Sequence, residues 1–298
     1  MQIHMRETLI RGVLLLALGL TVSMFHPVAA ADALPISKTR GSDTDLEISG
    51  LIQGLGENES GFVAHADLLK LPTETLSLKV DFYLEPSFEV TVVFMDDVMA
   101  ALPLKDGADT LLMICRDGYL TLFTEPFRAE YKPFIVLQIE GQNPPDWPET
   151  LNEQYLGPYY AAVSEELAPG YKDLFDGGGK RPWGAISMEI VNYEDEYAPI
   201  YSGGFSELSA SADQGRDIYM NNCMSCHRWE DDHFGGTTSN RVFPVLAGNA
   251  VHNSDYFRDF VRNPSKYMKG VYMPAHPHYT DEHFDKLTDF LAAYFDAP

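Results

Sequence analysis

One short string constrains the fold of this 298-residue chain more than any other feature, and it reads Cys223-Met-Ser-Cys226-His227. Two thiols one helical turn apart, followed at once by an imidazole, match the C-x-x-C-H pattern of covalent haem attachment. The thiols can add to two vinyl groups on one haem edge, and His227 can bind the iron from the same side. A redox dithiol and half of a zinc site are the alternatives. A thioredoxin-like dithiol needs a βαβ context, and a cysteine-based zinc site needs a second ligand pair, whereas the third cysteine, Cys115, lies far upstream.

The hydrophobic pattern changes its period near residue 200. Upstream, short apolar or alternating runs of strand length are broken by Gly, Pro and Asp. Strands are predicted over residues 76–83, 88–94, 110–115, 134–139 and 186–191, and a helix over 96–102.

From Ser209 onward the period is helical, and helices are predicted over residues 213–221, 254–261 and 281–295. The small, polar stretch 201–210 is the predicted linker. The sequence therefore predicts an N-terminal segment (31–45), an α+β, β-rich domain (46–200) and an all-α domain (211–298).

The first thirty residues have the features of an export signal. Arg6 and Arg11 precede an apolar run over 12–25, and Val28-Ala29-Ala30 supplies small residues for a signal peptidase. We expect residues 1–30 to be a cleaved signal peptide rather than an uncleaved anchor, because the run is too short to span a bilayer. No later stretch approaches about 18 consecutive apolar residues, so we expect no membrane span in the mature chain. The expected location is the bacterial periplasm, either in solution or membrane-associated through a partner complex.

Residues 207–298 resemble class I cytochrome c around the cysteine string. Gly215 and Tyr219 precede the string on one predicted helix, as in that family, where the glycine lets the first helix cross the last one closely. The crossing partner resembles Leu291-x-x-Tyr294 in the terminal helix. The resemblance implies one covalent haem c, bound through Cys223 and Cys226.

The same resemblance implies the ligands and the pocket of the haem. Pro244 stands in a stretch similar to the family's loop in which a proline carbonyl accepts the N–H of the haem histidine. The stretch 263–274 closely resembles the loop that delivers a thioether ligand, which implies that His227 and Met273 bind the iron and that Tyr267 lines the pocket. Met268 is the alternative ligand. His276, His278 and His283 are expected to be surface histidines.

The upstream domain is similar, in degenerate form, to the molybdopterin-binding fold of the sulfite oxidase type. Its landmarks are the stretches 66–72, 95–102, 115–119 and 181–190. The catalytic branch of that family carries a molybdenum-bound cysteine upstream of the 95–102 landmark, where this chain has none. Cys115 lies too late, so we expect it to be a buried packing residue, and we expect neither molybdenum nor molybdopterin.

Charge limits the classes of partner. Lys and Arg number 21 against 44 Asp and Glu, which argues against nucleic acid because phosphates attract the opposite sign. Residues 31–206 hold 11 basic and 30 acidic residues, and residues 207–298 hold 8 and 13. We therefore expect redox partner proteins with a basic docking surface.

Two functions remain compatible with these features. The first is a periplasmic mono-haem cytochrome that transfers single electrons, with the β-rich domain docking a partner and no catalytic residue of its own. The alternative is an oxidoreductase whose β-rich domain binds molybdopterin or a small molecule and passes electrons to the fused haem. The missing cysteine favours the first function.

Overall fold

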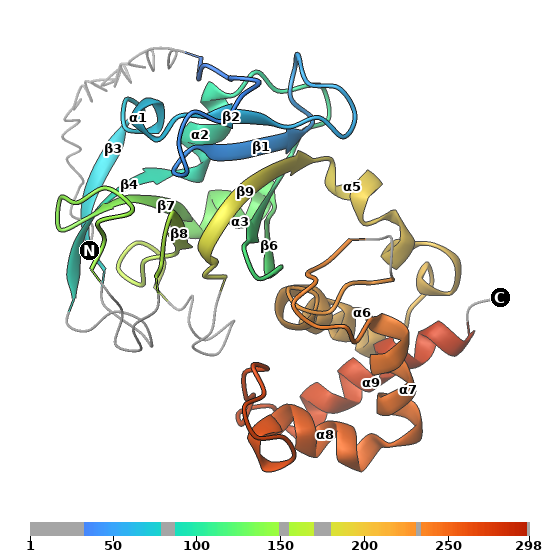
Figure 1. Ribbon diagram of the computed structural model, residues 1–298. Helices are drawn as coiled ribbons and strands as arrows, with labels where there is room; N and C mark the ends of the chain where they lie inside the picture. Colours follow the sequence, from blue (N-terminus) through green and yellow to red (C-terminus); the bar gives the residue numbers. More distant parts are fainter. Residues whose placement is uncertain (1–32, 79–86, 149–154, 170–179, 231–233, 297–298) are drawn as a thin grey trace, which may run out of the picture. The chain divides into compact units, whose positions relative to one another are not determined.

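The computed structural model describes residues 33–78, 87–148, 155–169, 180–230 and 234–296 (Figure 1). The expected signal peptide lies outside these residues. The described residues belong to one compact unit. In this part of the chain, no helix is both long enough and apolar enough to cross a membrane.

The upstream half, here called the β-rich region, is built on one sheet. Its strands are β1 (Leu46–Gly50), β2 (Gly61–Val63), β3 (Thr73–Leu78), β4 (Phe88–Phe94), β5 (Thr110–Cys115), β6 (Leu120–Phe123), β7 (Phe134–Ile139), β8 (Tyr159–Ala162) and β9 (Trp183–Val191). The strand order is β2-β1-β9-β8-β7-β4-β3, and the β5–β6 hairpin joins through β5 to β9. Only the β1–β9 pairing is parallel among the described strands.

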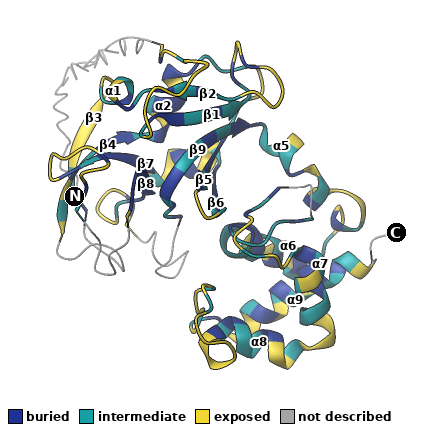
Figure 2. Cartoon of the chain, in the orientation of Figure 1, coloured by how far each residue is buried: buried dark blue, intermediate teal, exposed yellow. Residues whose placement is uncertain are grey.

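Strands β5 and β7 are mostly apolar, with Thr110 and Gln138 as their polar residues, because both of their faces are covered. On β5, Leu111 and Met113 lie in the main core of the sheet, whereas Leu112 on the opposite face packs with residues of the helices downstream. On β7, Ile135 lies in the main core and Phe134 in a second apolar cluster. Figure 2 shows the dark, buried strands at the centre of the β-rich region.

Short helices connect the strands. They are α1 (His65–Leu68), α2 (Met95–Ala101), α3 (Glu125–Tyr131) and α5 (Tyr193–Glu196). The side chain of Thr124 caps α3 by accepting a hydrogen bond from the Phe127 amide, as N-cap threonines do. Helix α2 follows β4 directly, close to the predicted bounds 96–102.

The downstream half, here called the helical region, holds α6 (Ala210–Ile218), the π-turn η3 (Tyr219–Cys223), α7 (Phe243–His252), α8 (Ser254–Arg262), the short η4 (Pro264–Lys266) and α9 (Asp281–Asp296). Helices α6, α8 and α9 agree with the sequence prediction. Helix α7 was not predicted, because the stretch around Pro244 indicated a loop. In the structure Pro244 stands in the first turn of α7, where proline is tolerated.

The predicted linker over 201–210 is a packed segment in the structure. It contains part of η1 (Ala198–Tyr201) and all of η2 (Gly203–Phe205). Phe205 is buried, and its ring lies 5.0 Å from that of Trp229 and 5.7 Å from that of Phe290. Phe205 thus fixes this segment to the helical region.

Candidate haem attachment site

The attachment segment, residues 219–227, continues α6 through a π-turn into a tight bend. The His227 amide donates to the Cys223 carbonyl at 2.9 Å, and the Cys226 amide donates to the same oxygen at 3.1 Å. This bend presents the two cysteines one turn apart, with both thiols free. The segment is also held from within, because the Tyr219 hydroxyl donates to the His227 carbonyl at 2.7 Å.

The environment of the two thiols fits attachment to an apolar macrocycle. Burial raises the pKa of Cys223 to about 12 and that of Cys226 to about 11. A redox dithiol needs the reverse, a lowered pKa that yields thiolate near neutral pH. In the described ranges, no three His, Cys, Asp or Glu residues cluster to hold a metal. Neutral thiols therefore favour the haem interpretation over a redox dithiol.

His227 is held in the tautomer that an iron ligand needs. Its Nδ1 lies 2.7 Å from the carbonyl oxygen of Arg241, so Nδ1–H donates and Nε2 is left to bind a metal. Burial lowers the pKa of the imidazole below its usual value, which keeps the ring neutral. Neutral imidazole is the form that coordinates metals.

The expectation that Pro244 supplies this carbonyl is wrong. The acceptor lies three residues earlier, at Arg241, in the chain just before α7. Pro244 belongs to the first turn of α7, where carbonyls point along the helix axis toward later amides. The sequence carried no signal for Arg241, because any residue type can provide a main-chain carbonyl.

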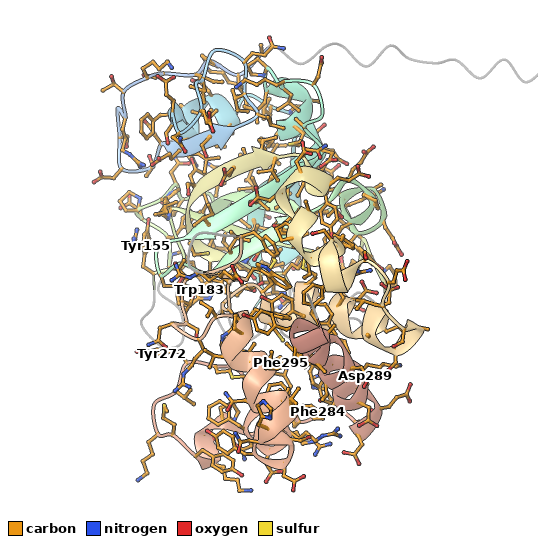
Figure 3. All side chains as sticks on the ribbon, turned by 90° about the vertical axis from the view of Figure 1, so that its right-hand side faces the viewer. Tyr155, Trp183, Tyr272, Phe284, Asp289 and Phe295 are labelled. Atoms are coloured by element: carbon orange, nitrogen blue, oxygen red, sulfur yellow. The ribbon has the colours of Figure 1, made fainter. Side chains whose placement is uncertain are left out.

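The two candidate thioether ligands differ in burial. Met273 is half-buried and packs against the apolar cluster that also contacts Cys223. Met268 is 52% exposed. Tyr272, beside Met273, is 94% exposed (Figure 3). The burial pattern therefore agrees with Met273 as the ligand on the second side of the iron.

Tyr267 lies at the surface rather than beside the attachment segment in its described contacts. It is 42% exposed, its hydroxyl donates to the Asp259 carboxylate at 3.1 Å, and its ring lies 5.1 Å from that of Tyr256. A role of Tyr267 in the haem pocket has no support from these contacts. His276 departs from the expectation of a surface histidine, because it is half-buried and stacks on Tyr279 at 4.8 Å.

The helix crossing behind the attachment segment requires a glycine. A Cβ on Gly215 would lie 2.0 Å from the Lys286 carbonyl oxygen and 2.9 Å from the Cβ of Phe290. Helix α6 therefore meets the main chain of α9 at Lys286, before the predicted partners Leu291 and Tyr294 along that helix. The Tyr219 ring packs at 5.7 Å from that of Phe290, below the same crossing.

In the β-rich region the third cysteine, Cys115, is a packing residue of the core, as expected. Cys115 is buried at the end of β5, and burial raises the pKa of its thiol well above the usual value. A lysine shortly before β9 is also part of the packed fold. Lys180 is buried, its Nζ donates to the Leu122 carbonyl at 2.8 Å, and burial lowers its pKa to about 7.

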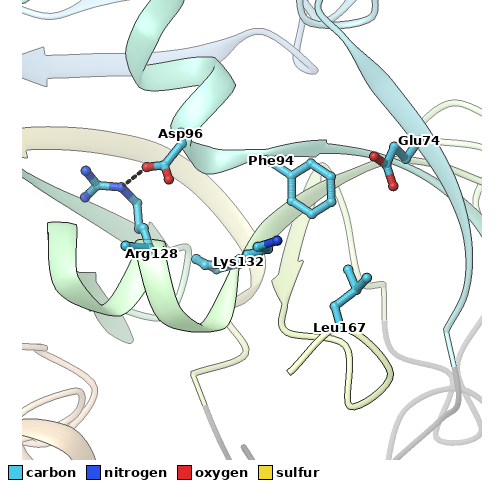
Figure 4. A pocket seen from close by; sticks show the side chains of 8 residues that line it. Glu74, Phe94, Asp96, Arg128, Lys132 and Leu167 are labelled. Carbon is cyan, nitrogen blue, oxygen red and sulfur yellow. Dashed lines mark hydrogen bonds and ion pairs between the residues drawn. The ribbon is translucent and has the colours of Figure 1, made fainter. Parts of the chain in front are cut away.

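A pocket of about 290 Å³ lies elsewhere on the β-rich region, beside α2 and α3 (Figure 4). Its charged lining is Glu74, Asp96, Arg128 and Lys132. Nε of Arg128 donates to the Asp96 carboxylate at 2.7 Å, and its Nη1 donates to the main-chain carbonyls of Asp109 and Phe123. Arg128 and Asp96 thus bind each other and the main chain, and they hold α3 against the start of α2.

Comparison with known proteins finds a family match on the helical region. The family model described as cytochrome c oxidase, cbb3-type, subunit III matches residues 210–291. Cytochrome c oxidase subunit 2 of Alkalihalophilus pseudofirmus is 26% identical over 118 residues, which make up 36% of this chain and 34% of that protein.

Among solved structures, the sulfane dehydrogenase SoxCD from Paracoccus pantotrophus has a TM-score of 0.35 and 14% identity over 54% of this chain and 42% of that one. This chain thus spans about a third of the oxidase subunit's length and less than half of the SoxCD chain.

The family match and the geometry coincide. The matched stretch runs from the start of α6 into α9 and contains the attachment segment, the Arg241 carbonyl and Met273. The partly buried thiols, the oriented imidazole and the close α6–α9 crossing all belong to it. Residues 210–291 of this chain form a cytochrome c domain, and such a domain serves electron transfer.

Proposed function

We propose that the protein is an exported, mono-haem electron-transfer protein whose β-rich region docks a redox partner. The observation that carries the proposal is the set of groups at the attachment segment: two partly buried, neutral thiols and a histidine whose Nδ1 is bound to a main-chain carbonyl. When bound, haem c supplies reversible one-electron chemistry at iron. We propose that Cys223 and Cys226 hold it and that His227 and Met273 bind the iron.

Each of these residues has a separate task. The Arg241 carbonyl orients the His227 ring and raises its basicity as a ligand. Met273 supplies a thioether, which favours ferrous iron relative to a second histidine. If His227 and Met273 both bound the iron, no ligand position would remain for a substrate, so the domain would transfer electrons rather than make bonds.

The charge distribution supports the docking role. Residues 31–206 hold 30 acidic and 11 basic residues, so most of the acids remain uncompensated whichever ion pairs form. In the helical region, by contrast, Arg258, Arg262 and Lys266 are each paired with an aspartate. These three bases are thus neutralised locally, whereas Lys269 has no ion pair among the described contacts. We propose that the negative field of the β-rich region attracts a partner with a basic surface.

Metal analysis separates this proposal from the oxidoreductase alternative. Mature protein purified from a host able to make both cofactors should contain one iron per chain and no molybdenum. Molybdenum at a comparable level would support the alternative and contradict the docking role assigned to the β-rich region.

A further inference from the structure

The turn between β5 and β6 is rigid. The Gly118 amide donates to the Cys115 carbonyl at 3.0 Å, and the Cys115 amide donates to the Tyr119 carbonyl at 2.8 Å. The Asp117 carboxylate accepts the Tyr119 amide at 3.0 Å. Gly118 has a φ of 85°, a value that glycine adopts without strain. The turn thus has a fixed shape, with Asp117 at its tip.

This turn is hydrogen-bonded to the attachment segment and to the loop beside it. The Leu120 amide donates to the Ser225 carbonyl at 3.0 Å, and the Thr237 amide donates to the Gly118 carbonyl at 2.8 Å. Ser225 stands between the two attachment cysteines, next to Cys226. A turn of the β-rich region therefore lies against the segment that holds the haem edge.

The fit at this contact is close. A Cβ on Gly118 would lie 2.2 Å from the Thr237 hydroxyl oxygen and 3.1 Å from its carbonyl carbon. Around the two hydrogen bonds, Leu120 and Leu122 pack in the same buried cluster as Tyr219 and Met224. The turn cannot slide along the segment without breaking both bonds and opening this cluster.

The contact brings a carboxylate near the haem edge. Asp117 is exposed and carries a negative charge, and it stands three residues before Leu120, whose amide is bonded to Ser225 next to Cys226. Once Cys226 is a thioether, the same charge acts on the haem that it holds. Oxidised iron carries one more positive charge than reduced iron, so a nearby negative charge favours the ferric state.

We propose that the β5–β6 turn tunes the haem, with Gly118 and Leu120 holding it on the attachment segment and the Asp117 carboxylate lowering the midpoint potential. This inference rests on the proposed function, since it requires covalent haem at Cys223 and Cys226. It gives the β-rich region a second role in addition to docking, as part of the electrostatic environment of the iron.

The test is the midpoint potential of full-length holoprotein with Asp117→Asn. Asparagine keeps an oxygen for the Tyr119 amide and removes only the charge. The equilibrium constant for reduction should rise on the order of threefold, which is about 28 mV at 59 mV per tenfold change. The shift should shrink in ~1 M salt, where the screening length is about 3 Å. Asp106→Asn, which removes an exposed charge from another turn, should leave the potential unchanged.

A second pair of variants tests the contact itself. Gly118→Val should push the turn off Thr237, and Asp117→Asn should then have little effect in that background. Gly141→Val is the matched control, because Gly141 also has a positive φ but would place its Cβ more than 4 Å from any neighbour. In the Gly141→Val background the full shift should persist.

The outcomes are distinguishable. If the haem is covalent but the Asp117→Asn and Asp106→Asn variants have the same midpoint potential, the inference fails while the proposed function stands. The same holds if Asp117→Asn shifts the potential by its full amount in the Gly118→Val background. Wild-type protein without covalent haem would overturn the proposed function and, with it, this inference.

Discussion

The Gly215 α-carbon faces the Lys286 carbonyl so closely that a Cβ there would lie 2.0 Å from its oxygen. This contact sets the distance between α6 and α9, and with it the place of the attachment segment that follows α6. A methyl group at this position cannot be accommodated by a flexible side chain, because the obstacle is main chain.

Gly215→Ala should therefore destabilise the protein by about 2 kcal/mol or more, the cost of overpacking a close contact. Gly248→Ala is the matched control. Gly248 lies inside α7 with nothing within 4 Å of its virtual Cβ, so alanine should stabilise that helix by up to ~1 kcal/mol. Urea unfolding of the two holoproteins measures both effects. Equal changes of the same sign would show that the crossing is looser than the structure indicates.

Met273→Ala should remove the weak red absorption band that sulfur-to-iron ligation gives and should lower the midpoint potential, because the thioether stabilises ferrous iron. Met268→Ala is the control, since its side chain is half exposed, and it should leave both properties nearly intact. Optical redox titration of the two variants checks this assignment. The reverse pattern would make Met268 the ligand.

His276 should make the stability depend on pH in the acid range. Burial lowers the pKa of its imidazole to about 4, below the usual value near 6.5 of an unfolded chain. As the pH falls through 6.5, the unfolded state binds a proton that the folded state does not, so stability is lost toward acid pH. The loss specific to His276 should be about 2 kcal/mol between pH 7 and pH 5.

The comparison with His276→Gln isolates this contribution from the many carboxylates. Glutamine does not titrate. The unfolding free energy of the wild type minus that of the variant should therefore be lower at pH 5 than at pH 7 by that amount. A difference that is the same at both pH values would mean that His276 gains its proton as easily in the folded state.

Neutralising acids on the β-rich region should slow electron transfer with a basic partner cytochrome at low salt. The exposed set Glu57, Asp106 and Glu125 can be changed together to the corresponding amides. The same number of exposed acids in the helical region, Glu207, Asp255 and Asp289, gives a control of equal net charge. Stopped-flow rates should fall more, and lose more of their salt dependence, with the first set. Equal losses would show that total charge matters rather than its location.

Much of the architecture follows from the sequence because its periodicity is strong. Strands β4, β5 and β7 begin and end where predicted, since each is an apolar run closed by polar or turn residues. The π-turn at Tyr219 and the helical course of α7 are not visible in such patterns. Pro244 pointed to a loop because its stretch resembles a loop of the cytochrome c family, but proline is also favoured in the first turn of a helix.

The parts of the site made by side chains were predictable, and the parts made by main chain were not. Cys223, Cys226 and His227 are a pattern of residue types, so the sequence shows them. The Arg241 carbonyl and the bond from the Leu120 amide to Ser225 depend on where the chain folds back, which no residue type encodes. Asp117 and Gly118 signal a turn, but not the segment that the turn contacts.

The most direct test of the account is extraction of the full-length protein with acidified acetone, which separates free haem from covalently bound haem. One haem per chain should remain with the precipitated protein. It should persist in Cys115→Ala and be lost in Cys223→Ala/Cys226→Ala, whose helical region should be unstable. Haem that passes into the solvent from the wild-type protein, or haem retained by the double variant, would contradict the central claim.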